Sequence, residues 1–229
     1  MQNLSNLEEK LGYKFKDKAR LAVALTHRSA KNGANNERLE FLGDAVMDLI
    51  VGEYLFVKFN SNEGDLSKLR AALVNETSFS KFARFLGIGA CLNMSASEEK
   101  NGGREKNSLL SDAFEATIGA LYLEVGLEKT AKIVTTLLEK IYPKIEFNEL
   151  VKDYKTSLQE ITQAKFGVTP EYRLLGSTGP DHKKSFEMAV FVGGKEFARD
   201  IGNSKKEAEQ KAAKIAIEIL EKSQGNIND

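Results

Sequence analysis

The chain has one cysteine, two histidines, no net charge and no long hydrophobic run in its 229 residues. The single Cys91 cannot form an internal disulfide, and no metal-ligand spacing surrounds it, which favours a reducing compartment. Residues 1–10 lack the apolar stretch of a secretory signal, and no apolar run approaches the roughly 18 residues of a membrane span. These absences predict a soluble, cytoplasmic protein.

Two further absences narrow the possible functions. Lysine plus arginine and aspartate plus glutamate both number 33, so any site for a polyanion must come from local arrangement. No glycine-rich loop precedes a Lys-Ser or Lys-Thr pair, so the phosphate loop of an NTPase is missing. His27 could serve as a general base, but without a nearby nucleophile a structural hydrogen-bonding role fits it better.

A stripe of acids stands out in residues 36–44, which read Asn-Glu-Arg-Leu-Glu-Phe-Leu-Gly-Asp. At about 100° per residue of a helix, one face carries the acids Glu37, Glu40, Asp44 and Asp48. The opposite face carries the apolar side chains Leu39, Leu42, Val46, Leu49 and Ile50. Stacked carboxylates repel one another, so the stripe is a solvated face, a face neutralised by Arg38 or Arg70, or a cation site.

A second predicted helix, residues 109–122, repeats the pattern. Asp112 and Glu115 are three positions apart, and Gly119 leaves space on the same face. Packed face to face, the two helices would bring together Glu40, Asp44, Asp112 and Glu115. Such hard oxygen ligands suit Mg²⁺ or Mn²⁺ and not zinc. The pattern therefore indicates metal-assisted hydrolysis of a phosphodiester.

The length allows two modest domains, and the composition changes after Pro143. We predict an all-helical domain followed by a small α-β-β-β-α domain, with these bounds: helical domain 1–147, linker 148–152, second domain 153–223 and polar tail 224–229. In the helical part we expect Asp17 to cap a helix, Asp65 or Ser67 to cap another, a surface loop over 97–106 and a helix over 128–141.

The second domain shows a change of period. A helix is expected over 153–164, strands over 170–175, 186–192 and 197–201, and a closing helix capped by Ser204. Gly193-Gly194 predicts a hairpin turn between the last two strands.

Two lysine pairs in this domain could contact an anion. Lys183 and Lys184 follow the loop 179–182, and Lys205 and Lys206 begin the last helix, where backbone N–H groups and the helix dipole favour phosphate. Each pair alone is commonly plain solvated surface. Together, on an α-β-β-β-α domain, the two pairs fit the phosphates and a groove of one duplex.

At these residues the chain resembles ribonuclease III, the bacterial endonuclease of double-stranded RNA, over nearly its whole length. Residues 36–44 are similar to the signature helix of that family, and residues 63–67 and 112–116 match its other acidic segments in order. The part after Asp153 resembles a double-stranded RNA-binding domain in the Gly-Pro-x-His loop of 179–182 and in the Ser-Lys-Lys-Glu-Ala of 204–208.

The resemblance implies roles for individual residues. It implies Mg²⁺, with Mn²⁺ as a substitute, held by Glu40, Asp44, Asp112 and Glu115, of which Asp44 and Glu115 are the most critical to catalysis. It implies supporting roles for Glu37 and Glu63. It implies contacts to RNA by Thr156, Gln159, His182, Lys183, Lys184, Lys205 and Lys206. Glu209 departs from a third lysine that many such domains carry, which would weaken the grip on phosphate.

The resemblance also implies a homodimer in which each subunit cuts one strand, leaving 5′-phosphate and 3′-hydroxyl ends. We therefore predict a Mg²⁺-dependent endoribonuclease that processes ribosomal RNA and other structured precursors such as messenger and transfer RNA. Two alternatives stay open: a double-stranded RNA-binding protein that does not cut, and an acidic helical scaffold for other proteins. Metal-triggered cleavage and salt-dependent binding of duplex RNA would distinguish the three.

Overall fold

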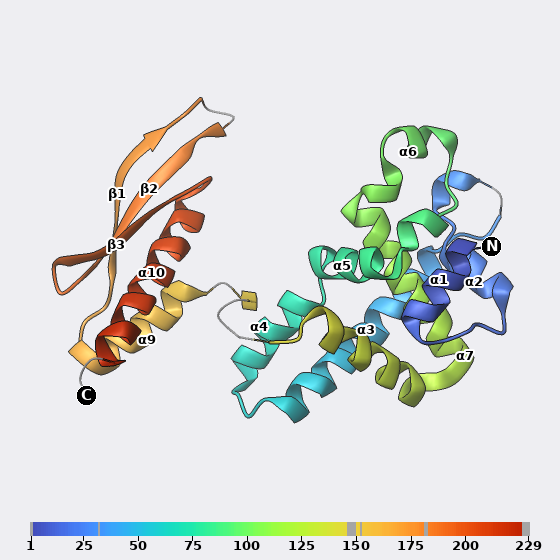
Figure 1. Ribbon diagram of the computed structural model, residues 1–229, viewed down its shortest axis with the longest axis horizontal. Coiled ribbons are helices and arrows are strands. Elements are labelled where there is room, and N and C mark those ends of the chain that lie inside the picture. The colour runs from blue at the N-terminus through green and yellow to red at the C-terminus, as the bar shows by residue number, and fades with distance from the viewer. Residues whose placement is uncertain (1, 32, 146–149, 152, 181–182, 226–229) are drawn as a thin grey trace. The chain divides into compact units, whose positions relative to one another are not determined.

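The computed structural model describes residues 2–31, 33–145, 150–151, 153–180 and 183–225. The chain divides into two compact units, Met1–Ile145 and Glu146–Asp229. The first is helical and the second combines two helices with a three-stranded sheet (Figure 1). This confirms the predicted fold class. The predicted linker falls partly, and the predicted tail mostly, outside the described residues.

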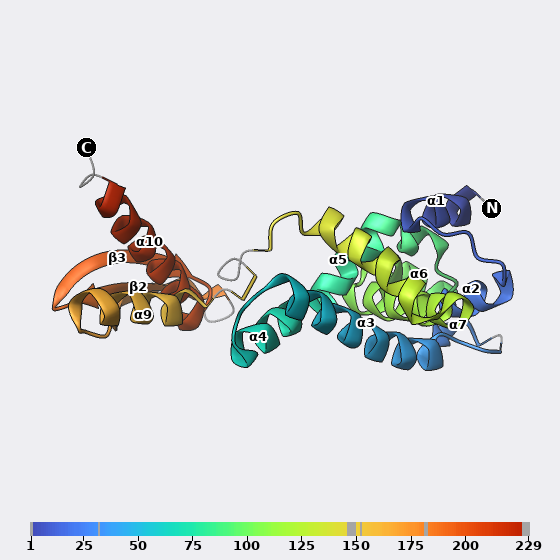
Figure 2. The ribbon, with the colours of Figure 1, turned by 90° about the horizontal axis from the view of Figure 1, so that it is seen from below.

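The helical unit is built around two long helices that cross. Its elements are α1 (Gln2–Leu11), α2 (Lys18–Ala24), η1 (Arg28–Ala30), α3 (Glu37–Lys58), α4 (Glu63–Leu73), α5 (Glu76–Leu86), η2 (Ile88–Cys91), α6 (Ala96–Lys100), η3 (Gly103–Glu105) and α7 (Asn107–Ile141). Helices α3 and α7 make the most extensive contact of any pair, and both views show them side by side (Figures 1 and 2).

Two glycines allow α3 and α7 to touch backbone to backbone. A Cβ atom on Gly43 would lie 1.8 Å from the carbonyl oxygen of Glu115, and a Cβ on Gly119 would lie 2.3 Å from that of Leu39. No side chain larger than hydrogen fits at either crossing point without moving a helix. This close approach fixes the distance between the acids on the two helices.

An aromatic cluster holds α5 against α7. The rings of Phe82 and Phe114 stack with centroids 5.0 Å apart, and Phe79 lies 5.5 Å from Phe114. All three side chains are fully buried, so burial of apolar area here stabilises the half of α7 that carries the acids.

Helix α7 is interrupted once. Gly126 adopts a φ of 76°, which glycine reaches at little cost, and the chain resumes a helix beyond it. The two predicted helices, 109–122 and 128–141, are therefore the two arms of one broken helix. On the first arm, Glu124 accepts hydrogen bonds from the Tyr13 hydroxyl at 2.7 Å and the backbone N–H of Lys16 at 2.7 Å, which ties the amino-terminal segment to α7.

Some local predictions hold and others are wrong. Asp17 caps α2 by accepting from the N–H of Arg20, as predicted. Helix α4 is capped by Asn62, one turn earlier than expected, because its side chain accepts from the N–H of Asp65. The predicted loop 97–106 contains α6 and η3, since Ser95 supplies an unexpected cap. The sequence pattern groups Leu49 with the apolar face of α3, but it is 55% exposed, whereas Leu39, Val46 and Ile50 of that face are buried.

The second unit is a sheet of three antiparallel strands, ordered β1-β2-β3, with helices packed on one face (Figure 1). Its elements are α9 (Tyr154–Phe166), β1 (Glu171–Thr178), β2 (Ser185–Val192), β3 (Lys195–Gly202) and α10 (Lys205–Gly225). Gly193 and Gly194 both take positive φ in the predicted turn, and Ser204 caps α10 by accepting from the N–H of Glu207. Small side chains let α10 lie close to the sheet, in a core made of Leu158, Val190, Ala198, Ala212, Ala213, Ala216, Ile217 and Leu220.

No helix of the described residues combines the length and the apolar character needed to cross a membrane.

Candidate metal centre and nucleic-acid interface

Three carboxylates from two helices converge where α3 crosses α7. Glu40 comes from the first turn of α3, and Asp112 and Glu115 come from the second and third turns of α7. One carboxylate oxygen from each lies within 4.8 Å of the other two, and all three side chains are half-buried. The glycine contacts at the helix crossing bring these side chains together.

Burial and mutual repulsion outweigh the nearby positive charge of Arg28 in this cluster. Burial, followed by the charges of Asp44, Asp112 and Glu40, raises the pKa of Glu115 to about 8. Burial also raises the pKa of Glu40 and of Asp112 above their ordinary values. Within the described chain, none of the three acids forms an ion pair with lysine or arginine. Carboxylates kept this close without a direct ion pair are expected to attract a cation.

The donor set fits a hard divalent ion. It consists of carboxylate oxygens, with no thiolate and no imidazole within the group, and it leaves room for water and phosphate oxygens as further ligands. Mg²⁺ and Mn²⁺ prefer such ligands, whereas zinc favours nitrogen and sulfur.

Asp44 lies next to this group and outside it. Its side chain is exposed, one turn beyond Glu40 on α3. It is near enough for its charge to raise the pKa of Glu115. Its own pKa is raised by a partial loss of solvent around its carboxyl group and by the charge of Asp48. The structure thus brings three of the four predicted ligands into one group and leaves the fourth at its edge.

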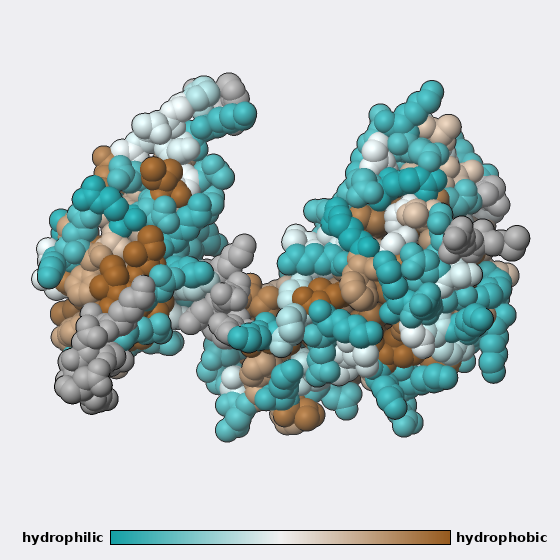
Figure 3. Space-filling view, in the orientation of Figure 1, coloured by the Kyte–Doolittle hydropathy of each residue, from teal (hydrophilic) through white to brown (hydrophobic). Residues whose placement is uncertain are grey.

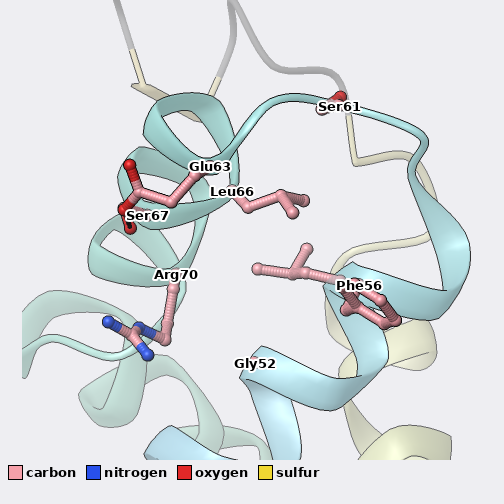
Figure 4. A pocket seen from close by; sticks show the side chains of 8 residues that line it. Gly52, Phe56, Ser61, Glu63, Leu66, Ser67 and Arg70 are labelled. Atoms are coloured by element: carbon pink, nitrogen blue, oxygen red, sulfur yellow. Dashed lines mark hydrogen bonds between the residues drawn. The ribbon is translucent and has the colours of Figure 1, made fainter.

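The two predicted supporting acids lie in different surroundings. Glu37 is 3.5 Å from the guanidinium of Arg28 at the exposed start of α3. Glu63 accepts a hydrogen bond from Ser67 at 2.9 Å, on the wall of a separate hollow of about 460 Å³ between α3 and α4. Figure 4 shows Glu63 beside Ser67, with Phe56 across the hollow and Arg70 below.

The two arginines considered as neutralising partners do not reach the cluster. Arg70 lies 3.8 Å from Asp48, one turn beyond Asp44, and Arg38 is exposed. The interpretation of the acids as an ion-paired face is therefore wrong for the three converging residues.

A second hollow, of about 260 Å³, borders the acid cluster directly. Its lining shares Glu40 and Asp112 with the cluster and adds His27, Arg28, Asn36, Glu37, Ser108 and Leu109. His27 makes the structural hydrogen bonds that the sequence suggested, because its Nδ1 bonds to Ser29. Asn36 and Ser108 also line this hollow. No sequence pattern predicts this, because the two residues are 72 positions apart and only the packing of α3 on α7 joins them.

The predicted RNA-binding residues lie on the surface of the second unit. Thr156 and Gln159 are exposed on α9, and the other exposed side chains of the set are Lys183, Lys184, Lys205 and Lys206. Lys205 and Lys206 occupy the first turn of α10. His182 lies outside the described residues.

Glu209, which replaces a lysine of the family pattern, has a structural partner. Its carboxylate lies 2.6 Å from the ammonium of Lys155, and that ammonium sits 4.5 Å from the ring centre of Tyr172. Glu209 thus ties α10 to α9 and the sheet.

Comparison with known proteins covers both units. The family model described as Ribonuclease-III-like matches residues 17–141, and the one described as double-stranded RNA binding motif matches residues 154–220. The chain is 63% identical over 223 residues to the Ribonuclease 3 of Campylobacter curvus, covering 97% of this chain and 100% of that one. It is 64% identical over 214 residues to the Ribonuclease 3 of Campylobacter fetus, covering 93% and 96%.

Solved structures resemble the helical unit. A crystal structure of the nuclease domain of Ribonuclease III from Campylobacter jejuni matches with a TM-score of 0.61 at 60% identity, covering 64% of this chain and 100% of that one. A second structure of that domain, described for structural flexibility in a region involved in dimer formation, matches with a TM-score of 0.59 at 61% identity, covering 61% and 98%.

Proposed function

The chain belongs to the ribonuclease III family of double-stranded RNA endonucleases, and we propose that it cleaves with Mg²⁺ held by Glu40, Asp112 and Glu115. The observation that carries this proposal is the convergence of three unpaired carboxylates within 4.8 Å. Asp44, at the edge of the group, would complete the ligand set directly or through water.

The chain's own residues position the reacting groups. When bound, a divalent ion supplies positive charge that acidifies water and offsets the charge developing on the phosphate. Glu115 and Asp112, on one arm of α7, and Glu40, on α3, hold the carboxylate oxygens at fixed separation because Gly43 and Gly119 lock the crossing. Such preorganised ligands need little rearrangement when the substrate arrives. Hydrolysis would leave 5′-phosphate and 3′-hydroxyl ends.

The second unit would bring the duplex to this centre. Lys205 and Lys206 at the start of α10 present positive charge beside backbone N–H groups, which suits phosphate. Thr156 and Gln159 on α9 would reach the minor groove of A-form RNA. Ribosomal RNA and other structured precursors are the substrates that the family membership suggests.

Self-association is part of the proposal. Phe41, Leu49 and Phe56 are 80%, 55% and 75% exposed, and their spacing puts them on one side of α3. Figure 3 shows a brown, apolar patch at the lower left of the helical unit, where α3 and α4 meet in Figure 1. Large exposed apolar side chains in a stripe are typical of a protein–protein interface. A homodimer would cover them and place two metal centres on one duplex.

Cleavage of an RNA hairpin with a long duplex stem tests the function. We expect cleavage only when Mg²⁺ or Mn²⁺ is added, and Glu115→Gln to slow it roughly 100-fold or more, because several kcal/mol of charge stabilisation depend on the metal. Duplex binding without metal should be unchanged in the variant. Metal-independent cleavage, or full activity of Glu115→Gln, would contradict the metal centre, and binding without any cleavage would favour a non-cutting RNA-binding protein.

A further inference from the structure

The 260 Å³ hollow beside the acid cluster has a lining that the metal does not require. Glu40 and Asp112 form one wall, and the others include His27, Asn36 and Ser108. These added groups are hydrogen-bonding and include no further metal ligand of the cluster. A polar hollow directly against the reacting centre is suited to a part of the substrate next to the bond that is cut.

The backbone of Asn36 is held by hydrogen bonds, whereas its side-chain amide bonds to no other described residue. It is 3% exposed, its backbone N–H donates to the carbonyl of Thr26 at 2.9 Å, and its own carbonyl accepts from the N–H of Glu40 at 2.8 Å. It occupies the cap position of α3, yet its side chain makes no capping bond and none to another described residue. Because Asn36 lines the hollow and its amide is not sealed from solvent, the amide is available to bond a polar ligand there.

The His27 ring adds a donor. Its Nδ1 accepts from the backbone N–H of Ser29, so the neutral ring carries its proton on Nε2. Ser108, from the first turn of α7, adds a hydroxyl. The hollow therefore offers hydrogen-bond donors from His27, Asn36 and Ser108 and acceptors from Asn36 and the acids.

The charge of the lining excludes an anion as the buried group. Glu37, Glu40 and Asp112 outnumber the one guanidinium, that of Arg28. Even with two of these acids on a metal ion, Glu37 still offsets Arg28, from which it lies 3.5 Å away. A neutral group that both donates and accepts hydrogen bonds fits better, and in an RNA strand the ribose 2′-hydroxyl is such a group.

We propose that this hollow binds the ribose 2′-hydroxyl of a nucleotide adjacent to the cleaved bond, with Asn36 as the residue that selects RNA over DNA there. The proposal rests on the proposed function, because it presumes that the acid cluster is the cutting centre. It assigns substrate selection to the helical unit in addition to the RNA-binding unit.

A scan of single 2′-deoxy substitutions tests it. Each nucleotide within four positions of the cut is changed in turn, and single-turnover cleavage with Mg²⁺ is measured. One substitution should slow wild-type cleavage roughly 2- to 10-fold, the effect of one lost hydrogen bond. Asn36→Ala should cleave the all-RNA substrate more slowly than wild type by a similar factor. The variant should cleave the all-RNA and the 2′-deoxy substrates at equal rates, because the two changes remove the same hydrogen bond.

A second variant and a control complete the design. Ser108→Ala is a small change at an exposed side chain, and it should reduce the ratio between the cleavage rates of the all-RNA and the 2′-deoxy substrates. This variant decides the question if Asn36→Ala does not fold. Asn6→Ala, an exposed asparagine on α1, should keep the full wild-type discrimination.

The outcomes separate this inference from the proposed function. Failure of the wild type to cut the all-RNA duplex with metal would overturn the proposed function. Cleavage of that duplex with no sensitive 2′ position near the cut would overturn only the inference. Equal discrimination by wild type, Asn36→Ala and Ser108→Ala would also overturn it.

Discussion

At the scale of single residues, Glu115 illustrates how a functional cluster costs stability. Its pKa in the metal-free fold is about 8, against 4.5 for an ordinary glutamate. Between these values the folded chain binds more protons than the unfolded chain, so the free energy of unfolding falls as pH rises. The penalty is absent below pH 4.5 and is fully present above pH 8.

This argument predicts that Glu115→Gln stabilises the metal-free protein. Near pH 8 we expect the unfolding temperature of the variant to be about 2–4 °C higher, the shift that roughly 1 kcal/mol gives in a chain of this size. Near pH 4.5 the two proteins should unfold at the same temperature. Thermal unfolding in EDTA across this pH range measures the difference, and a variant less stable than wild type at pH 8 would show that the carboxylates do not repel one another.

At the scale of secondary structure, the glycines at the crossing of α3 and α7 determine the spacing of the acids. A methyl group at position 119 would lie 2.3 Å from the Leu39 carbonyl, so Gly119→Ala must push the helices apart. We expect a loss of about 1–3 kcal/mol in the free energy of unfolding. We also expect metal affinity to fall, because the carboxylates on the two helices separate.

Gly52→Ala is the matched control on α3. Its added methyl would meet the Arg70 side chain at 3.8 Å, an ordinary contact, so it should unfold no more easily than wild type. Denaturant unfolding and Mn²⁺ binding by calorimetry test both variants. Equal metal affinity in Gly119→Ala and wild type would mean that helix separation does not control the site.

The sequence predicted much of this element-level arrangement, because periodicity reports which face of a helix a residue occupies. It thereby predicted the acids on both long helices, the alternating strands and the caps at Asp17 and Ser204. Periodicity does not report how far apart two faces lie. The exclusion of Asp44 from the close group therefore emerged only from the packed helices, as did the role of Gly43. Leu49 was misassigned because an exposed apolar stripe has the same helical period as a buried one.

At the scale of the whole molecule, the α3 stripe of Phe41, Leu49 and Phe56 predicts that the chain associates with itself. In a symmetric interface, Leu49→Glu would place two carboxylates among apolar groups. We expect the dimer dissociation constant to rise roughly 100-fold or more, since each buried unpaired charge costs upward of 1.4 kcal/mol. Leu123→Glu, at a leucine of similar exposure on α7, should have no such effect. Sedimentation over a range of concentrations would measure this, and an unchanged dimer in Leu49→Glu would contradict the interface.

Residues 1–145 carry 20 basic and 19 acidic side chains, and residues 146–229 carry 13 and 14, so neither unit has a large net charge. Binding to RNA therefore depends on local clusters of charge within each unit. The acids at the crossing of α3 and α7 repel a phosphate backbone until metal binds, so the lysines at the start of α10 should supply attraction independent of metal.

Replacing Lys205 and Lys206 by alanine removes two phosphate contacts. The logarithm of affinity plotted against that of salt concentration should become shallower by about 2, equally for all duplex sequences. Fluorescence anisotropy of Glu115→Gln, with and without the two alanines, measures this slope on uncut RNA. A loss confined to particular sequences would show that these lysines read bases, because contacts to phosphate carry no sequence information.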